Sequence, residues 1–271
     1  MPPGNPIVTH WNKEIEVFDE NLILLRQQLT ADAIHNMRVT IKKLRSYLKL
    51  CGALMKKEND KNALATTKEL FSVLGKHRNL ETGKQLLLSL SHKNQQVLDP
   101  VLLYLQLLQD QAGKYCREML SQYEKKELDQ VTSQVEKELK NLTDEELAKN
   151  TRNLITDSRR QIKQGLKHFR DKFHVVRKDL KNIFYWAKIF KDHVILSKPE
   201  VKAIDKILGY LGNMQDHEVI LAHLKNFRKT VVSKGNRGYD LIRRIEAKAK
   251  TRQSSFLEKA NQLTDQLLRK L

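Results

Sequence analysis

The sequence predicts an all-α fold, and three observations support this. Apolar residues recur three and four positions apart through almost the whole chain, which is the pattern of amphipathic helices. Only 5 of the 271 residues are proline, at positions 2, 3, 6, 100 and 199, so the interior holds almost nothing that would break a helix. The 10 glycines and the 6% of aromatic residues are too few for the turns and strands of a β sandwich or barrel.

The predicted helices follow one another along the chain with short connections. We expect them at 11–29, 31–56, 60–75, 79–92, 98–123, 125–141, 144–166, 168–194, 199–211, 216–230 and 237–270. Pro100 and Pro199 are expected at helix starts, because the first N–H groups of a helix have no partner within it. Two of these helices carry an apolar stripe at the spacing of a core seam. The stripes are Ile34, Met37, Ile41, Leu44, Leu48 and Cys51 in the first, and Phe173, Val176, Leu180, Ile183, Ala187 and Phe190 in the second.

Composition indicates the cellular compartment in which the protein is expected. Cys51 and Cys116 both lie in helical patterns, so a disulfide framework is not expected and a reducing compartment is. No run approaches the ~18 apolar residues of a membrane span, and residues 1–6 lack the pattern of a signal peptide. We therefore expect a cytoplasmic protein that does not insert into membranes.

Net charge is the first indication of function. The chain carries 50 Lys and Arg against 32 Asp and Glu, a net charge of +18, which implies a polyanionic partner such as nucleic acid, an anionic membrane surface or a phosphate polymer. The charge is uneven: +6 over 31–57, +9 over 150–191 and −3 over 122–149. The acidic stretch is expected to form exposed connecting helices rather than a site.

An internal repeat explains this layout. His35, Arg38 and Lys42 recur as His174, Arg177 and Lys181, 139 residues later. Each copy is followed, 38 to 40 residues on, by a Leu-Gly-x-x-x-Asn/Asp element, Leu74 to Asn79 and Leu211 to Asp216. The repeat predicts one domain over 1–271 with two similar helical halves, 1–123 and 150–271, joined by 124–149. The glycines of the second element are expected to end or bend a helix, and its Asn or Asp to cap the next.

Beside each apolar stripe runs a row of basic residues, which we call the first and second ladders. The first ladder is His35, Arg38, Lys42, Arg45 and Lys49, and the second is His174, Arg177, Lys181 and Lys188, with Lys178 on its flank. Like charges four residues apart destabilise a helix by roughly 0.2–0.5 kcal/mol per pair, so an anion that completes the face is expected. A straight row about 21 Å long suits a linear polyanion.

Plainer interpretations compete with this one. A basic run is usually a solvated face, and a single copy would indicate no more than that; the repetition in both halves favours a site. His35 and His174 either pack at the bundle junction or donate to phosphate oxygens. His217 and His223 are six residues apart, too far around the helix for the two histidines of a zinc site. No phosphate-binding loop, nucleophile motif or carboxylate pair accompanies the ladders, so no catalytic residue, metal or cofactor is predicted.

The repeated His-x-x-Arg-x-x-x-Lys helix with its Leu-Gly-x-x-x-Asn/Asp element resembles the CHAD family, named for a conserved-histidine α-helical domain, over about 10–270. The resemblance implies two four-helix bundles related by pseudo-twofold symmetry, a central basic cavity or groove, and binding of inorganic polyphosphate without known catalysis. The residues that it assigns to binding are His35, Arg38, Lys42, Lys43, Arg45, Lys49, Arg78, His174, Arg177, Lys178, Lys181 and Lys188. The chain departs from the family pattern at Phe184, where a base is usual, and at Asn79, where Asp is usual.

The sequence therefore predicts a non-catalytic polyphosphate-binding protein of the cytoplasm, associated with polyphosphate granules. Two alternatives stay open: a helical RNA-binding protein and, behind it, an enzyme acting on phosphate chains. Single-strand binders combine a basic groove with stacking aromatics, and here only Tyr47 and Tyr185 lie beside the ladders. The sequence leaves open the chain length of the polymer, the oligomeric state, and the part played by six further bases. These are Lys114, Arg117, Arg159, Arg160, Arg243 and Arg244.

Overall fold

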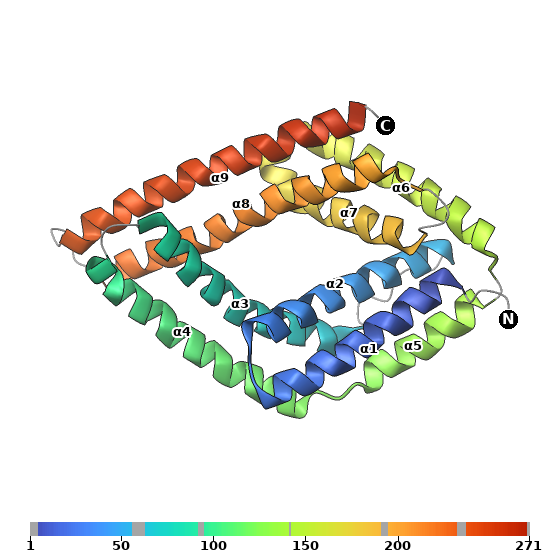
Figure 1. The fold of residues 1–271 in the computed structure, drawn as a ribbon, viewed down its shortest axis with the longest axis horizontal. Coiled ribbons are helices and arrows are strands. Elements are labelled where there is room, and N and C mark those ends of the chain that lie inside the picture. Colours follow the sequence, from blue (N-terminus) through green and yellow to red (C-terminus); the bar gives the residue numbers. More distant parts are fainter. Residues whose placement is uncertain are drawn as a thin grey trace.

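The computed structural model describes residues 5–55, 63–91, 95–140, 142–190, 195–231 and 237–269. Within these ranges it contains nine α-helices and no strand, which confirms the all-α class (Figure 1). The helices are α1 (Pro6–Gln27), α2 (Ala31–Leu54), α3 (Ala65–Ser91), α4 (Gln95–Gln122), α5 (Lys126–Leu139), α6 (Asp144–Leu166), α7 (Phe169–Ile189), α8 (Lys198–Thr230) and α9 (Arg237–Arg269).

Helix starts are fixed by local capping. The Asn5 side chain accepts hydrogen bonds from two backbone N–H groups at the start of α1, and Thr30 Oγ1 accepts one from Ala33 at the start of α2. α6 begins with a capping box in which Thr143 and Glu146 bond reciprocally. Such caps satisfy N–H groups that a helix leaves without internal partners, and they place the helix starts at defined residues.

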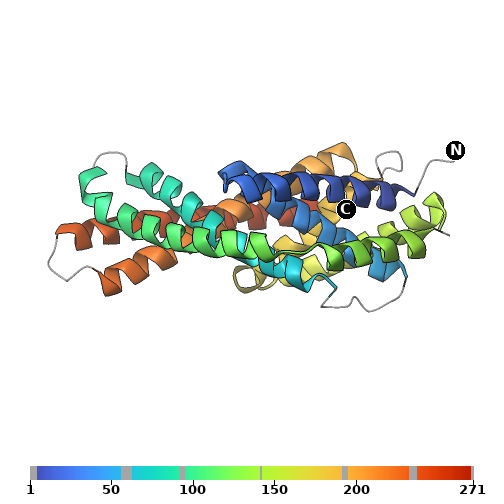
Figure 2. The ribbon, with the colours of Figure 1, turned by 90° about the horizontal axis from the view of Figure 1, so that it is seen from below.

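Two four-helix halves lie on either side of a central space. α1–α4 form one half and α6–α9 the other, related by an approximate twofold, with α5 completing the circuit between them (Figure 1). Seen from below, the molecule is long and shallow (Figure 2). The halves meet where α2 lies against α7 and α3 against α8. The inner helices of both halves, including the two that carry the predicted ladders, therefore face the middle of the molecule.

The buried core joins the two halves. The larger of two apolar clusters draws on every helix and contains Trp11, Phe18 and Trp186; the smaller fills the far end, where α3, α4, α8 and α9 meet. Trp186 Nε1, on α7, donates a buried 2.9 Å hydrogen bond to the backbone oxygen of Ser46 on α2. Both clusters mix residues from early and late in the chain. The boundaries 1–123, 124–149 and 150–271 stay a prediction.

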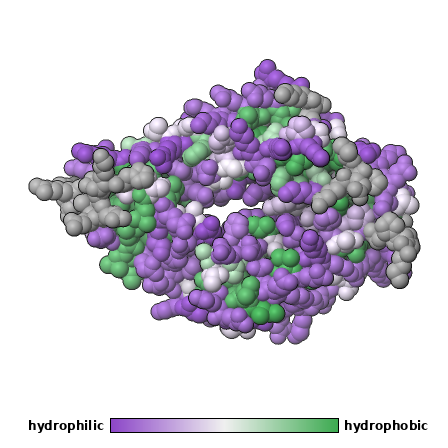
Figure 3. All heavy atoms as spheres, in the orientation of Figure 1, coloured by the Kyte–Doolittle hydropathy of each residue, from purple (hydrophilic) through white to green (hydrophobic). Residues whose placement is uncertain are grey.

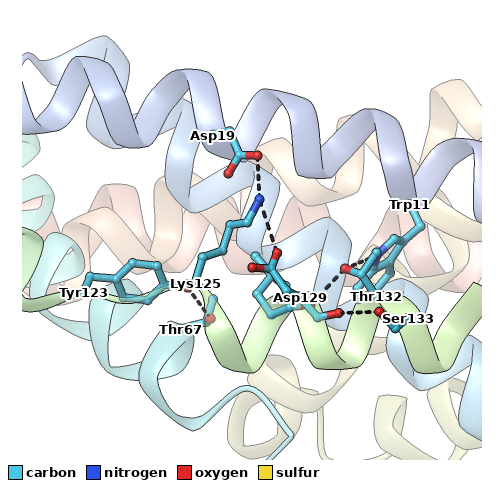
Figure 4. Close-up of polar contacts among 9 residues, drawn as sticks. Trp11, Asp19, Thr67, Tyr123, Lys125, Asp129, Thr132 and Ser133 are labelled. Carbon is cyan, nitrogen blue, oxygen red and sulfur yellow. Dashed lines mark hydrogen bonds and ion pairs between the residues drawn. The ribbon is translucent and has the colours of Figure 1, made fainter.

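The acidic stretch is more than an exposed connection. α5 buries Leu128, Val131, Val135 and Leu139 in the larger cluster, so the expectation of an exposed connecting helix is wrong for its inner face. Amphipathic patterning decides this, because these four apolar residues recur three and four positions apart on one face of the helix. Figure 4 shows how the stretch is attached to the first half, with Lys125 Nζ 2.7 Å from Asp19 Oδ2 and 3.3 Å from Asp129 Oδ1. Trp11 Nε1 donates to Thr132 Oγ1 at 3.0 Å in the same view.

Three predicted helix boundaries are wrong. The ranges 60–75 and 79–92 belong to one helix, α3, and 199–211 and 216–230 belong to one helix, α8. Gly75 and Gly212 therefore lie inside helices, and Asn79 and Asp216 cap nothing. Pro100 lies inside α4 rather than at its start, whereas Pro199 lies in the first turn of α8 as expected. The parts of the expected helices at 56, 60–62, 92, 141, 191–194 and 270 lie outside the described residues.

Candidate functional site

The two ladders lie on α2 and α7, beside the apolar stripes that hold these helices in the core. Ile34, Met37, Ile41 and Leu44 are almost fully buried, as are Val176 and Leu180 on α7. Burial of these stripes fixes the rotation of each helix about its axis. Because α2 and α7 pack against each other, the neighbouring basic rows are brought to one place.

A cavity of about 500 Å³ lies between the ladders. In the space-filling view the molecule is hollowed at its centre, and hydrophilic residues surround the opening (Figure 3). The lining comes from α2, α7 and the region that begins α3. It consists of Lys42, Arg45, Ser46, Leu48, Lys49, Leu64, Lys68, His174, Arg177, Lys178, Lys181, Asn182 and Tyr185. Positions about 139 residues apart in the sequence therefore share one basic cavity.

The structure brings together most of the predicted site residues. Seven line the cavity: Lys42, Arg45, Lys49, His174, Arg177, Lys178 and Lys181. Three more extend this group, because His35, Arg38 and Arg78 interact electrostatically with one another and with Lys42. Two lie apart from the cavity lining. Lys43 Nζ is 2.6 Å from Glu14 Oε1 on α1, and Lys188 Nζ lies 4.1 Å from the ring centre of Phe184. A contact of these two with ligand stays a prediction.

Burial and the crowding of cations lower the pKa of two cavity lysines. Burial, with the charges of Arg38 and Arg177, lowers the pKa of Lys42 to about 8. Burial, with the charges of Lys42, Arg177 and Arg38, lowers the pKa of Lys181 to about 7. Both effects disfavour the charged ammonium in the free protein. Burial and the charges of Arg78, Lys42 and Arg38 also lower the pKa of His35.

The ladder arginines are held in place by the neighbouring helices. Arg38 Nη1 donates to the backbone oxygen of Phe71 at 2.5 Å, and its guanidinium lies 4.1 Å from the centre of the Phe71 ring. In the second half, Arg177 Nη1 donates to Gln215 Oε1 at 2.5 Å. Burial and the charge of Arg78 lower the pKa of Arg38 to about 10. Both guanidinium groups are thus ordered before any ligand is present.

Sequence reasoning missed Phe71 and Lys68, both on α3. The ring of Phe71 lies under three first-ladder cations, with Lys42 and Arg45 5.6 and 5.7 Å from its centre. Lys68 lines the cavity. Once α3 is taken as one helix, Lys68, Phe71, Gly75 and Arg78 fall at intervals of three and four on one face. That spacing is the signal that could have found them, and the expected break at Gly75 hid it.

Acidic residues near the second ladder were also missed. His174 Nε2 lies 3.7 Å from Glu218 Oε2, and Lys49 Nζ lies 3.7 Å from Asp179 Oδ1. Asp216 interacts with Arg177, Arg78 and Lys42, and burial raises the pKa of its carboxyl group despite those cations. α7 and α8 therefore place three carboxylates beside the ladder cations, although the ladders themselves contain no acid.

Other groups considered from the sequence lie elsewhere. His217 Nδ1 is 2.7 Å from the backbone oxygen of Asn213, within its own helix. In the described part of the chain, no three His, Cys, Asp or Glu side chains are grouped so that they could hold a metal ion. Cys51 and Cys116 are free, and burial raises the pKa of both thiols.

The six further bases whose role the sequence left open do not line the cavity. Arg159 pairs with Glu200 at 3.4 Å and Arg160 with Asp157 at 3.2 Å. The other four are exposed at the surface: Lys114, Arg117, Arg243 and Arg244. Among the described helices, none has a stretch long and apolar enough to span a membrane.

Comparison with known proteins gives this arrangement a family. The family model of the CHAD domain matches residues 10–225, which include both ladders and both Leu-Gly elements. The crystal structure of the CHAD domain from the plant Ricinus communis superposes with a TM-score of 0.69 at 15% identity, covering 96% of this chain and 90% of that one. No curated protein sequence matches the chain. The chain belongs to the CHAD domain family.

Proposed function

We propose that this protein binds inorganic polyphosphate in the cavity between α2 and α7, with the two ladders as facing walls, and that it does so without catalysis. One observation carries the proposal: six Lys and Arg side chains and His174, from two helices far apart in the sequence, line a single cavity. Arginine offers a planar fork that bonds two phosphate oxygens at once, and lysine adds compact positive charge. The membership in the CHAD family agrees with this function.

The electrostatics of the free site support a polyanion as ligand. Without a ligand, burial and the neighbouring cations lower the pKa values of Lys42 and Lys181 to about 8 and about 7. This arrangement is unfavourable until negative charge enters the cavity. A phosphate chain would neutralise both walls together and release its own counterions, so affinity should fall steeply with salt.

The shape of the basic surface favours a linear polymer over a compact anion. A single phosphate needs one cluster of donors, whereas here basic residues run along α2 from His35 to Lys49 and face a second row on α7. At 1.5 Å per residue the first row extends about 21 Å. A chain of phosphates, with one negative charge on each internal unit, matches such rows.

RNA and phosphate-chain cleavage are the rival functions. Single-stranded RNA binders stack bases on exposed aromatics, but Tyr47 is only 3% exposed, which leaves Tyr185 among the tyrosines beside the ladders. A cleaving enzyme of the metal-dependent kind needs carboxylates to hold the divalent ion. Among the residues that line the cavity none is acidic, and the three carboxylates beside it, Asp179, Asp216 and Glu218, form no group that could hold a metal ion in the described part of the chain.

Titration calorimetry with long-chain polyphosphate and with single-stranded RNA of matched charge tests the proposal. We expect tight binding of polyphosphate and much weaker binding of RNA at the same salt. Equal affinities would remove the claim of specificity. Incubation with polyphosphate and a divalent cation, followed by gel analysis of chain length, tests the absence of catalysis: time-dependent shortening would make the protein an enzyme.

Cellular placement follows from the same ligand. If polyphosphate is the partner, we expect the protein in the cytoplasm and associated with polyphosphate granules. Fluorescence imaging of the tagged chain beside a polyphosphate stain checks this expectation. Loss of co-localisation in cells that cannot make the polymer would support it, and an unchanged distribution would contradict it.

A further inference from the structure

Gly75 lies in the interior of α3, where a glycine needs another explanation than a helix end. Its helix continues for 16 residues to Ser91, and intrinsic preference favours alanine at such a position. What surrounds Gly75 is specific. A methyl group there would lie 3.0 Å from Arg38 Cζ and 3.3 Å from Nη2, and closer still to Nη1. All three nearest atoms therefore belong to one guanidinium group, that of the first ladder.

The second half has the same pairing in a looser form. Gly212 lies inside α8, and a methyl group there would have a single neighbour within 4 Å, Arg177 Nη2 at 3.9 Å. In both halves the glycine of the Leu-Gly element thus faces the arginine of the ladder. The distance from an added methyl group to the guanidinium is an ordinary van der Waals contact at Gly212 but an overlap at Gly75. What the two copies of the repeat share is therefore the pairing of a glycine with a ladder arginine, and not a helix boundary.

We propose that Gly75 is a positioning residue of the polyanion site: the absence of its side chain lets the Arg38 guanidinium lie against α3. There the guanidinium donates to the Phe71 oxygen at 2.5 Å and stacks 4.1 Å from the Phe71 ring centre. Arg38 is then ordered before ligand arrives, and less side-chain freedom is lost on binding. Its charge also acts on Lys42, Lys181 and His35.

A double-mutant cycle of Gly75→Ala and Arg38→Ala isolates this role. The binding part rests on the proposed function; the stability part does not. We expect G75A to weaken polyphosphate binding about tenfold and to lower the melting temperature. In the R38A background the same change should do neither, because the added methyl group then meets no guanidinium. The pH profile of affinity adds a readout: G75A should shift its midpoint upward, since displaced Arg38 no longer depresses the pKa of Lys42.

Two other glycines of the chain provide matched controls. At Gly209, in α8, an added methyl group would have no neighbouring atom within 4 Å, so G209A reports helix propensity alone. G212A should weaken binding less than G75A, because Arg177 Nη2 is 3.9 Å away. The proposal is overturned if G75A binds and melts like wild type, or if it causes the same losses with and without Arg38. If the wild type fails to bind polyphosphate, the melting temperatures of the cycle still decide whether Gly75 and Arg38 are coupled.

Discussion

The two ladders have similar sequences but different surroundings. Three cations of the first ladder lie over the Phe71 ring, and at the end of this ladder Lys49 meets Asp179 of α7. The second ladder is interleaved with acids, since His174 meets Glu218 and Asp216 lies near Arg177. The first ladder thus lies mainly against an aromatic ring, whereas two members of the second ladder lie beside acids of α8. Charge counted along one helix does not give the charge of a site, because neighbouring helices supply partners.

Removing cations from both walls at once is expected to have the largest effect. Replacing Arg38, Lys42 and Arg177 together by alanine should weaken polyphosphate binding on the order of a thousandfold, because each loses a charge-assisted contact of about 1.5–3 kcal/mol. Circular dichroism should show unchanged helix content, since the apolar stripes that hold α2 and α7 are untouched. Unfolding of the triple variant would instead make these residues structural.

Proton linkage gives the second largest effect. Bound polyphosphate favours the charged ammonium groups, whose pKa values in the free protein are about 8 for Lys42 and about 7 for Lys181. Affinity should therefore fall as pH rises from 7 to 9, by up to about tenfold per pH unit for each lysine above its free pKa. Calorimetry in buffers of different ionisation enthalpy should show proton uptake on binding. If no protons were taken up on binding near pH 8, the claim that Lys42 and Lys181 are partly uncharged in the free protein would be contradicted.

The same pKa shifts determine whether the stability of the ligand-free protein rises or falls with pH. Each lysine has a folded pKa below its ordinary value, so folding disfavours its charged form. That penalty is complete below about pH 7 and fades as pH rises toward the ordinary lysine pKa of about 10.4. The ligand-free protein should thus gain stability from these two groups between pH 7 and 10. Denaturant titrations across that window check the direction.

A pair of single substitutions on α2 compares compensated with uncompensated charge. Lys42→Gln should lower affinity about tenfold, because the charged groups that act most on Lys42 are arginines and the half-buried Asp216. Lys49→Gln should lower it only a few-fold, since Lys49 already lies 3.7 Å from Asp179 Oδ1 and must exchange that partner for phosphate. Calorimetry of both variants at one salt concentration measures the difference. Equal losses would show that Asp179 does not compete with the ligand for Lys49.

The smallest expected effect is a gain in affinity. Asp216→Asn removes negative charge next to Arg177, Arg78 and Lys42 while keeping nearly the same shape. Polyphosphate should bind a few-fold more tightly, because the carboxylate no longer competes with the ligand for these cations. Weaker binding by this variant would instead make Asp216 part of the recognition of the ligand.

The sequence was sufficient for the helical class, the repeat and most of the cavity lining, for a physical reason. Regular apolar spacing determines which face of α2 and α7 is buried, so the row beside it, Lys42 or Lys181, can be located from the spacing alone. Partners on other helices could not be located in this way. Asp216 and Glu218 reach the second ladder only because α8 runs without a break through Gly212.

The glycines show the limit most clearly. From the sequence alone, the Gly of a Leu-Gly pair fits the end of a helix, and the Asn or Asp that follows fits the N-cap of the next helix. In three dimensions Gly75 is explained by the guanidinium of Arg38, 37 positions earlier. Local preferences predict that the helix ends at Gly75. The helix instead continues, and the glycine is explained by a tertiary contact. Phe71, Gly75 and Arg78 could be grouped on one face only after that break was removed.

Lysine footprinting with polyphosphate tests the central claim, that one polymer contacts both ladders, most directly. The free protein and the complex are acylated briefly, and modification at each lysine is quantified by mass spectrometry. We expect polyphosphate to protect Lys42 on α2 and Lys181 on α7 from acylation over the same range of ligand concentration. Exposed lysines outside the cavity, Lys137 and Lys202, should react equally in both samples. Protection of only one ladder, or of all lysines alike, would contradict the account.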